Sequence, residues 1–207
     1  MITVQPYTYE DLFRDLPNLG NGILLDLGCG SQRGFTRTYI SYLYKRLAAD
    51  TNPTAMAEAS RRPENNTIAV DLEHKLLEAL PLGKSVCSDA RCLPFSDAFF
   101  DIVAMGWLLD RLKGKQEIYK VMRESSRVLK ERGYLIGDVA LHPIRSVHER
   151  LGGAELSFDL PSYYRQMVFY RNILPKFGFN ILSSGMGFNS EQIDEYHTFY
   201  FVAQKVT

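Results

Sequence analysis

The chain has 207 residues, 45% of them hydrophobic, and its 24 Lys and Arg residues balance its 24 Asp and Glu residues. This length suits one domain with a sizeable core, and the lack of a basic excess argues against nucleic acid as the main partner. No apolar run approaches the roughly 20 residues needed to cross a bilayer. Three cysteines make no disulfide framework, and Cys87 and Cys92 have no second pair nearby for a metal site. With no secretory signal at the start, we expect a cytoplasmic protein without a membrane partner.

Short β-rich runs alternate with helix-length amphipathic runs, which predicts an α/β fold with a parallel sheet covered by helices. A short helix is expected near residues 8–15, within an N-terminal cap segment formed by residues 1–20. Strands are expected at residues 22–27, 67–71, 85–89, 100–105 and 134–139. Further helices are expected at about residues 35–48, 53–62, 74–80, 116–130 and 161–175.

The C-terminal third carries two last strands, near residues 179–184 and 197–204. They match a hairpin because the linker between them is too short for a packed helix. Earlier in the chain, Gly133 is placed to end the helix at 116–130. We see no second-domain boundary, so residues 1–207 are expected to form one domain, with residues 140–176 as a candidate lid and substrate region.

The most informative residues follow the first strand. Asp26, Gly28, Cys29 and Gly30 form an Asp-x-Gly-Cys-Gly sequence at its end. Glycines in this position let the backbone approach a ligand where a Cβ would collide. Taken alone, the sequence also fits a tight strand-to-helix turn in which Asp26 accepts hydrogen bonds from local N–H groups.

Three acids, Asp26, Asp71 and Asp89, stand at the ends of the first three expected strands. The carboxyl ends of parallel strands meet at one edge, where open α/β sheets bind ligands, so we expect these carboxylates to lie together. Asp71 can accept from ribose hydroxyls and Asp89 from an adenine amine, while the backbone N–H of Ala90 or Arg91 faces a ring nitrogen. An acid beside the glycine loop suits a cationic nucleoside, since it would repel a pyrophosphate. For each acid singly, a strand-end cap or a surface charge is the alternative.

Three segments in this order, DLGCG from residue 26, SDARCLPFSDAFFDIV from residue 88 and RVLKERGYL from residue 127, resemble class I S-adenosylmethionine-dependent methyltransferases. The match covers roughly residues 22–140. The resemblance implies S-adenosylmethionine as cofactor and S-adenosylhomocysteine as its product. It also implies a Rossmann-like three-layer sandwich whose seven-stranded, mostly parallel sheet has an antiparallel last strand.

The resemblance further implies that Asp26, Gly28 and Gly30 line the methionine end of the cofactor and that Asp89 and Ala90 hold adenine. The residues expected to bind the cofactor are Asp26, Gly28, Cys29, Gly30, Asp71, Asp89, Ala90, Arg91, Met105 and Gly106.

Two residues, Asp50 and Asp71, are candidates for the acid that binds the ribose. The family usually has it about 20 residues beyond the glycine loop, which would select Asp50. We favour Asp71, because residues 67–71 combine strand-forming residues with a preceding turn. A strand ending at Asp50 would follow a helix with no breaker between them.

Methyl transfer from a sulfonium is an in-line displacement, to which positioning alone can contribute roughly 7–11 kcal/mol. A base is needed only when the acceptor arrives protonated, so no catalytic residue is assigned. His142, just after the fifth strand, is the candidate base, with a solvated loop histidine as the alternative. Trp107, after the fourth strand, is either a wall of the acceptor pocket or a packed aromatic. That segment lacks the Asn/Asp-Pro-Pro-Tyr/Phe sequence of enzymes that methylate nucleic-acid amines.

These features predict S-adenosylmethionine-dependent transfer of a methyl group to a small-molecule acceptor. A dinucleotide-dependent oxidoreductase is the first alternative, suggested by Gly28, Gly30 and Gly34. The acid at position 26 and the glycine spacing argue against it. A catalytically silent binding subunit on the same fold is the second alternative. The sequence leaves the acceptor, the methylated atom and the oligomeric state open.

Overall fold

The computed structural model describes residues 4–14, 16, 22–49, 63–78, 83–141, 162–189 and 198–206. Their strands are β1 (Val4–Tyr7), β2 (Leu24–Leu27), β3 (Thr67–Asp71), β4 (Lys84–Cys87), β5 (Phe100–Gly106), β6 (Leu129–Ala140), β7 (Phe179–Asn189) and β8 (Thr198–Lys205). Their helices are α1 (Tyr9–Arg14), α2 (Gly34–Ala49), α4 (His74–Glu78), α5 (Lys115–Val128) and α7 (Ser162–Ile173), with 3-10 turns η1 (Pro63–Asn66), η2 (Leu109–Arg111) and η3 (Leu174–Phe177).

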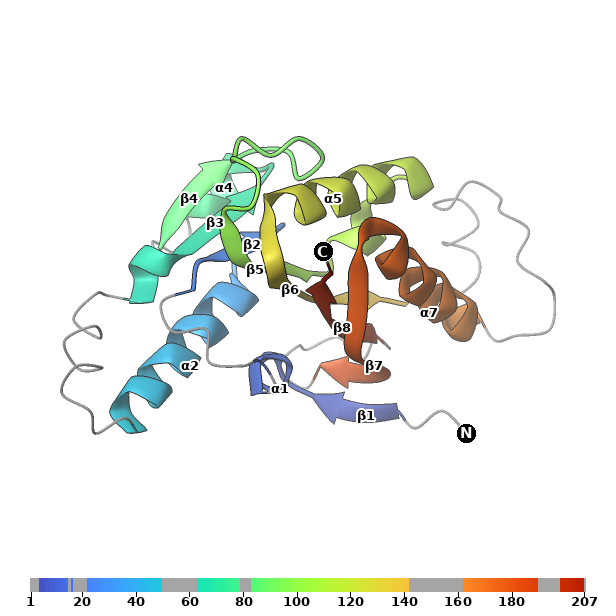
Figure 1. Ribbon diagram of the computed structural model, residues 1–207, viewed down its shortest axis with the longest axis horizontal. Helices are drawn as coiled ribbons and strands as arrows, with labels where there is room; N and C mark the ends of the chain where they lie inside the picture. The colour runs from blue at the N-terminus through green and yellow to red at the C-terminus, as the bar shows by residue number, and fades with distance from the viewer. Residues whose placement is uncertain are drawn as a thin grey trace.

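The described strands form one sheet in the order β1-β7-β8-β6-β5-β2-β3-β4, with helices on both faces (Figure 1). β6, β5, β2, β3 and β4 are mutually parallel. β8 runs antiparallel to both β6 and β7. The expected mostly parallel, Rossmann-like sheet with an antiparallel last strand is confirmed, and so is the C-terminal hairpin.

The described sheet has one strand more than the seven expected: β1, which lies at its edge. It pairs in parallel with β7, from Val4 opposite Met186 to Tyr7 opposite Asn189. The sequence predicts only a helix in this N-terminal segment. That helix, α1, begins after Thr8, whose hydroxyl oxygen accepts from the backbone N–H of Asp11, while the Asp11 carboxylate accepts from the backbone N–H of Thr8. This reciprocal capping fixes where the chain leaves β1 and enters α1.

One boundary differs from its prediction. Gly133 does not end a helix, because α5 already ends at Val128 and Leu129 is extended, with φ −79° and ψ 134°. Gly133 instead lies in an irregular start of β6, where the register with β5 shifts. A Cβ on Gly133 would lie 2.9 Å from the carbonyl oxygen of Lys130 and 3.0 Å from that of Asp101. The glycine therefore permits a close backbone approach in a bulge.

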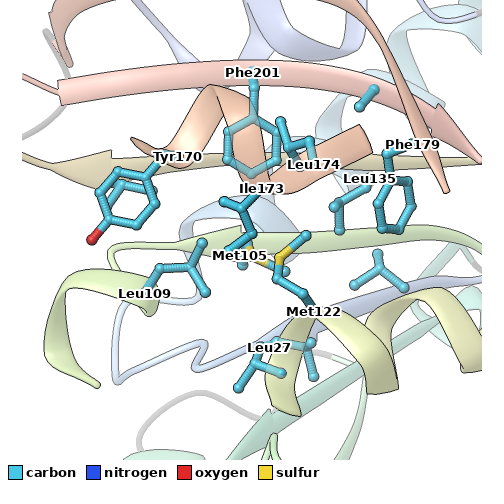
Figure 2. Packing of buried hydrophobic residues seen from close by; sticks show 14 of the residues in the cluster. Leu27, Met105, Leu109, Met122, Leu135, Tyr170, Ile173, Leu174, Phe179 and Phe201 are labelled. Carbon is cyan, nitrogen blue, oxygen red and sulfur yellow. The ribbon is translucent and has the colours of Figure 1, made fainter. Parts of the chain in front are cut away.

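The core lies on both faces of the sheet, because side chains alternate along each strand. Val103 and Met105 of β5 belong to a cluster with residues of α5 and α7, and Ile102 and Ala104 belong to another with residues of α1 and α2. Figure 2 shows the first cluster, which holds Leu27, Met105, Leu109, Met122, Leu135, Tyr170, Ile173, Leu174, Phe179 and Phe201. Burial on both faces explains why the central strands are almost continuously apolar.

Several predictions fall outside the described residues: the helix at 53–62, Asp50, His142 and most of the region 140–161. None of the helices in the described ranges combines the length and apolarity needed to cross a membrane.

Candidate active site

The loop after β2 is shaped by two glycines in the left-handed region, Gly28 with φ +64° and Gly30 with φ +57°. The backbone N–H groups of Gly28 and Cys29 donate to the carbonyl oxygen of Val70, at 2.8 and 3.2 Å. A Cβ on Gly28 would lie 2.9 Å from Cδ1 of Leu108, whereas a Cβ on Gly30 would meet no atom within 4 Å. Packing thus requires the first glycine, and the second leaves an open face beside the backbone.

Asp26, the residue before the last of β2, is almost completely buried, with 1% of its surface exposed. Its Oδ2 accepts from the backbone N–H and the hydroxyl of Thr36, at 3.0 and 2.8 Å, in the first turn of α2. Burial raises the pKa of this carboxyl to about 6, although the hydrogen bonds from Thr36 and the guanidinium of Arg33 act in the opposite direction. Asp26 therefore ties the end of the strand to the start of the helix.

Asp71 ends β3 and joins the glycine loop to the next strand. Its Oδ2 accepts from the backbone N–H of Gly30 at 3.0 Å, and its Oδ1 accepts from that of Glu73 at 3.0 Å. Its carbonyl oxygen accepts from the backbone N–H of Ser88 at 3.0 Å. Because Asp50 lies outside the described residues, the choice between the two ribose candidates stays a prediction.

Asp89 follows β4 and is held by Arg91. The Arg91 backbone N–H donates to Oδ1 at 2.8 Å, and its Nε and Nη2 donate to Oδ1 and Oδ2 at 2.9 and 2.7 Å. Hydrogen bonds from Arg91 lower the pKa of Asp89. Arg91 also forms an ion pair with Glu117 of α5. The half-buried Ala90 lies between Asp89 and Arg91 in the chain. The ionised carboxylate of Asp89, held by Arg91, is therefore an acceptor next to the backbone of Ala90.

The three acids lie along one edge of the molecule. β2, β3 and β4 are neighbours and parallel, so Asp26, Asp71 and Asp89 all stand at carboxyl ends of the sheet. The chain returns from β4 to β5 on the other side of β2, which makes this edge the point where strand order reverses. Ligands of open α/β sheets bind at such a point.

The end of β5 completes this edge. The side chain of Met105 is fully buried in the core, and Gly106 pairs with Asp138 of β6. Trp107 is half-buried with φ +49°, and its backbone N–H donates to the carbonyl oxygen of Asp138 at 3.1 Å. A positive φ is rare for a bulky side chain and is typical of residues held in place at functional sites. His142 lies outside the described residues.

Two residues near the glycine loop, Arg33 and Leu72, were not predicted from the sequence. Arg33 is fully buried with φ +48°, and its Nη2 donates to the carbonyl oxygen of Leu77 and, at 2.8 Å, to Oγ of Ser85. Nothing in the sequence marks this arginine as buried. Leu72 is 64% exposed directly after Asp71. The sequence could have indicated Leu72, because it is an apolar residue directly after an acid at the end of a strand.

A third set was also missed: Tyr7, Asp138 and Thr198, which meet in the interior at the carboxyl end of β6. Asp138 stands near the end of its strand in the same way as Asp71, and the same argument from strand ends could have found it.

Residues 25–137, more than half of the chain, match the family model described as a methyltransferase domain. No curated protein matches the chain significantly in sequence. The fold is similar to an S-adenosylmethionine-dependent methyltransferase from Methanosarcina mazei, at 17% identity over 98% of this chain and 99% of that one, with a TM-score of 0.61. A second from Clostridium acetobutylicum gives 14% identity, 96% and 91% coverage and a TM-score of 0.61. The methyltransferase CalH, solved with S-adenosylhomocysteine, gives 14% identity, 96% and 54% coverage and a TM-score of 0.60.

Proposed function

Because this chain belongs to the methyltransferase-domain family, we propose that it transfers the methyl group of S-adenosylmethionine to a small-molecule acceptor and releases S-adenosylhomocysteine. The observation that carries the proposal is the alignment of Asp26, Asp71 and Asp89 along the carboxyl edge, beside a loop opened by Gly30. A row of carboxylates suits a cofactor that carries positive charge and no phosphate. The oxidoreductase alternative would bring a pyrophosphate against the same acids.

The cofactor follows the order of the strands in this proposal. Its methionine end lies at the loop after β2, near Asp26, Gly28, Cys29 and Gly30. Its ribose hydroxyls donate to Asp71 of β3. Its adenine reaches the segment after β4, where Asp89, Ala90 and Arg91 offer an acceptor and backbone donors. The exposed side chain of Leu72 supplies an apolar surface for the adenine base. Met105 and Gly106 of β5 lie at the other end of the site, beside the methionine part of the cofactor.

When bound, the cofactor supplies a methyl group on a cationic sulfur. The chain's part is to hold this group in line with the acceptor and to exclude water. Trp107, fixed at the end of β5, is the proposed wall of the acceptor pocket, and His142 remains a candidate base for acceptors that arrive protonated. Residues 140–176 are the proposed lid and substrate region of a single domain that comprises residues 1–207.

The balanced charge of the chain and its free cysteines, Cys29, Cys87 and Cys92, support two further parts of the proposal. The acceptor is a small molecule rather than a nucleic acid, because no excess of basic residues is available to neutralise phosphates. The protein works in the cytoplasm, where thiols stay reduced.

Ligand binding tests the proposal directly. S-adenosylhomocysteine at about 100 times its dissociation constant should raise the unfolding free energy by about 2.7 kcal/mol, measured by denaturation, and NAD should leave it unchanged. The variant Asp89→Ala should weaken S-adenosylhomocysteine binding by about 1–3 kcal/mol, because a charged acceptor is lost. Asp97→Ala is the matched control, since Asp97 lies in the same segment, is 77% exposed and pairs with Arg127. Stabilisation by NAD and none by S-adenosylhomocysteine would contradict the proposal.

A further inference from the structure

A buried polar cluster, made of Tyr7, Asp138 and Thr198, lies at the carboxyl end of β6. The hydroxyl of Tyr7 donates to Oδ2 of Asp138, and Oγ1 of Thr198 donates to the hydroxyl of Tyr7 at 3.0 Å. Asp138 and Thr198 are 0% exposed and Tyr7 is 5% exposed. The three residues come from β1, β6 and β8, so the first and last strands of the chain both help to fix one carboxylate.

The second oxygen of this carboxylate lies beside the end of β5. A Cβ on Gly106 would be 3.5 Å from Oδ1 of Asp138, 3.2 Å from the hydroxyl oxygen of Tyr9 and 3.3 Å from a ring carbon of Phe35. Two oxygens and an aromatic ring therefore surround the position where Gly106 has no side chain. Gly106 belongs to the proposed cofactor site, so this polar cluster borders the site.

The strand order shows which end of the cofactor is nearest. Along the carboxyl edge the sequence of strands is β6, β5, β2, β3 and β4. In the proposed function, adenine lies at β4, ribose at β3 and methionine at the loop after β2. Asp138 on β6 is thus at the opposite end from the proposed adenine position, beyond the loop proposed for the methionine end.

We propose that the carboxylate of Asp138, with the Tyr9 hydroxyl beside it, makes the site bind the cationic donor more tightly than the neutral product. This inference rests on the proposed function. During transfer the acceptor forms a bond to the methyl carbon, and the electron pair of the broken C–S bond stays on sulfur. The sulfonium of S-adenosylmethionine thereby becomes the neutral thioether of S-adenosylhomocysteine. A negative charge close to the sulfur favours the first over the second and assists release of the product.

The hydrogen bond from Tyr7 favours the ionised form of the Asp138 carboxyl, which burial alone would disfavour. A charge held away from water is weakly screened by salt and needs no reorganisation when the ligand binds. Burial, and after it the Asp138 carboxylate, raise the pKa of Tyr7 far above its ordinary value, so its hydroxyl stays a neutral donor. Asp138 acts through its charge, and no contact with the reacting atoms is assigned to it.

The test compares two ligands in one titration series. Dissociation constants for S-adenosylmethionine and S-adenosylhomocysteine are measured by calorimetry with the wild-type protein and with Asp138→Asn. The amide oxygen of Asn can still accept from Tyr7, so the variant removes the charge and keeps the hydrogen bond. We expect binding of S-adenosylmethionine to weaken about tenfold and that of S-adenosylhomocysteine to change by less than about twofold.

The matched control is Asp101→Asn, which removes the same charge at the amino end of β5, where Asp101 pairs with Lys130 at 2.9 Å. Its ratio of the two dissociation constants should equal that of the wild type. Tyr9→Phe provides a second variant that keeps the ring packing, and it should weaken S-adenosylmethionine alone by about threefold; it decides the matter if Asp138→Asn does not fold. Equal effects on both ligands, or no effect, would overturn the inference. A wild-type protein that binds neither ligand would instead overturn the proposed function.

Discussion

At the scale of single residues, Asp26 shows how a residue of the proposed binding site can lower the stability of the folded protein. The ordinary pKa of an aspartate, 3.8, is raised by burial to about 6 in the folded chain. The folded state therefore holds its proton more tightly than the unfolded state does. Stability from this group is complete below about pH 4 and is lost as the pH rises through about 6. At neutral pH the charged, buried carboxylate opposes folding.

The variant Asp26→Asn should remove this penalty. Its amide oxygen can accept both hydrogen bonds from Thr36, so the turn is kept. In urea denaturation of the ligand-free protein near pH 7.5, we expect the variant to be more stable than the wild type by about 1–3 kcal/mol, and near pH 4.5 the difference should fall to about a third of that value. Binding of S-adenosylmethionine should weaken at the same time. An identical stability difference at both pH values would refute the account of Asp26.

At the scale of elements, the first turn of α2 depends on a glycine for packing. A Cβ on Gly34 would lie 2.5 Å from Cε2 of Tyr9. The ring of Tyr9 also packs on that of Phe35, with centroids 4.2 Å apart. Gly34 therefore admits the aromatic ring that attaches α1 to α2, which is a different role from the third glycine of a dinucleotide loop.

Gly34→Ala should lower the unfolding free energy by about 1–3 kcal/mol, since the added methyl group forces the ring to move. In a Tyr9→Ala background, where the ring is absent, the same change should cost much less. Thermal or chemical denaturation of the four proteins in this double-mutant cycle measures the coupling. Additive effects would show that the ring is not what Gly34 accommodates.

Elements with strong local signals were predicted well. β3 has the predicted bounds because Thr67–Asp71 combines β-branched residues with a turn before it. β1 was missed because its four residues, VQPY, have no such pattern and become a strand only through pairing with β7. The methyltransferase assignment is confirmed by the family model, since its motifs are local in sequence.

The missed parts of the site depend on contacts between distant residues. Tyr7 and Asp138 are separated by 131 positions, and their hydrogen bond arises only when β1 joins the far edge of the sheet. The burial of Arg33 likewise depends on α4 and β4 closing around it. No periodicity or spacing along the chain records these contacts, whereas the positions of Asp26, Asp71 and Asp89 follow from parallel topology alone.

At the scale of the whole molecule, the strands differ sharply in burial. Every residue of β2 is buried, whereas β4 at the sheet edge is mostly exposed. Hydrogen exchange should therefore be slowest in β2, β5 and the apolar part of β6, and fastest in β4, because edge strands open without unfolding the core. S-adenosylhomocysteine should slow exchange at the glycine loop and β4 most. Uniform protection of all described strands would contradict this view.

The first turn of α2 contacts two other parts of the protein. Gly34 leaves room for the ring of Tyr9 and Phe35 packs on it, while the backbone N–H of Thr36 donates to Asp26. The contact to Asp26 of the proposed donor site and the contacts to Tyr9 of α1 thus come from three consecutive residues. If a compound bound against α1 strengthens binding of the proposed donor through this turn, thermodynamic reciprocity requires that the donor strengthens binding of that compound by the same factor.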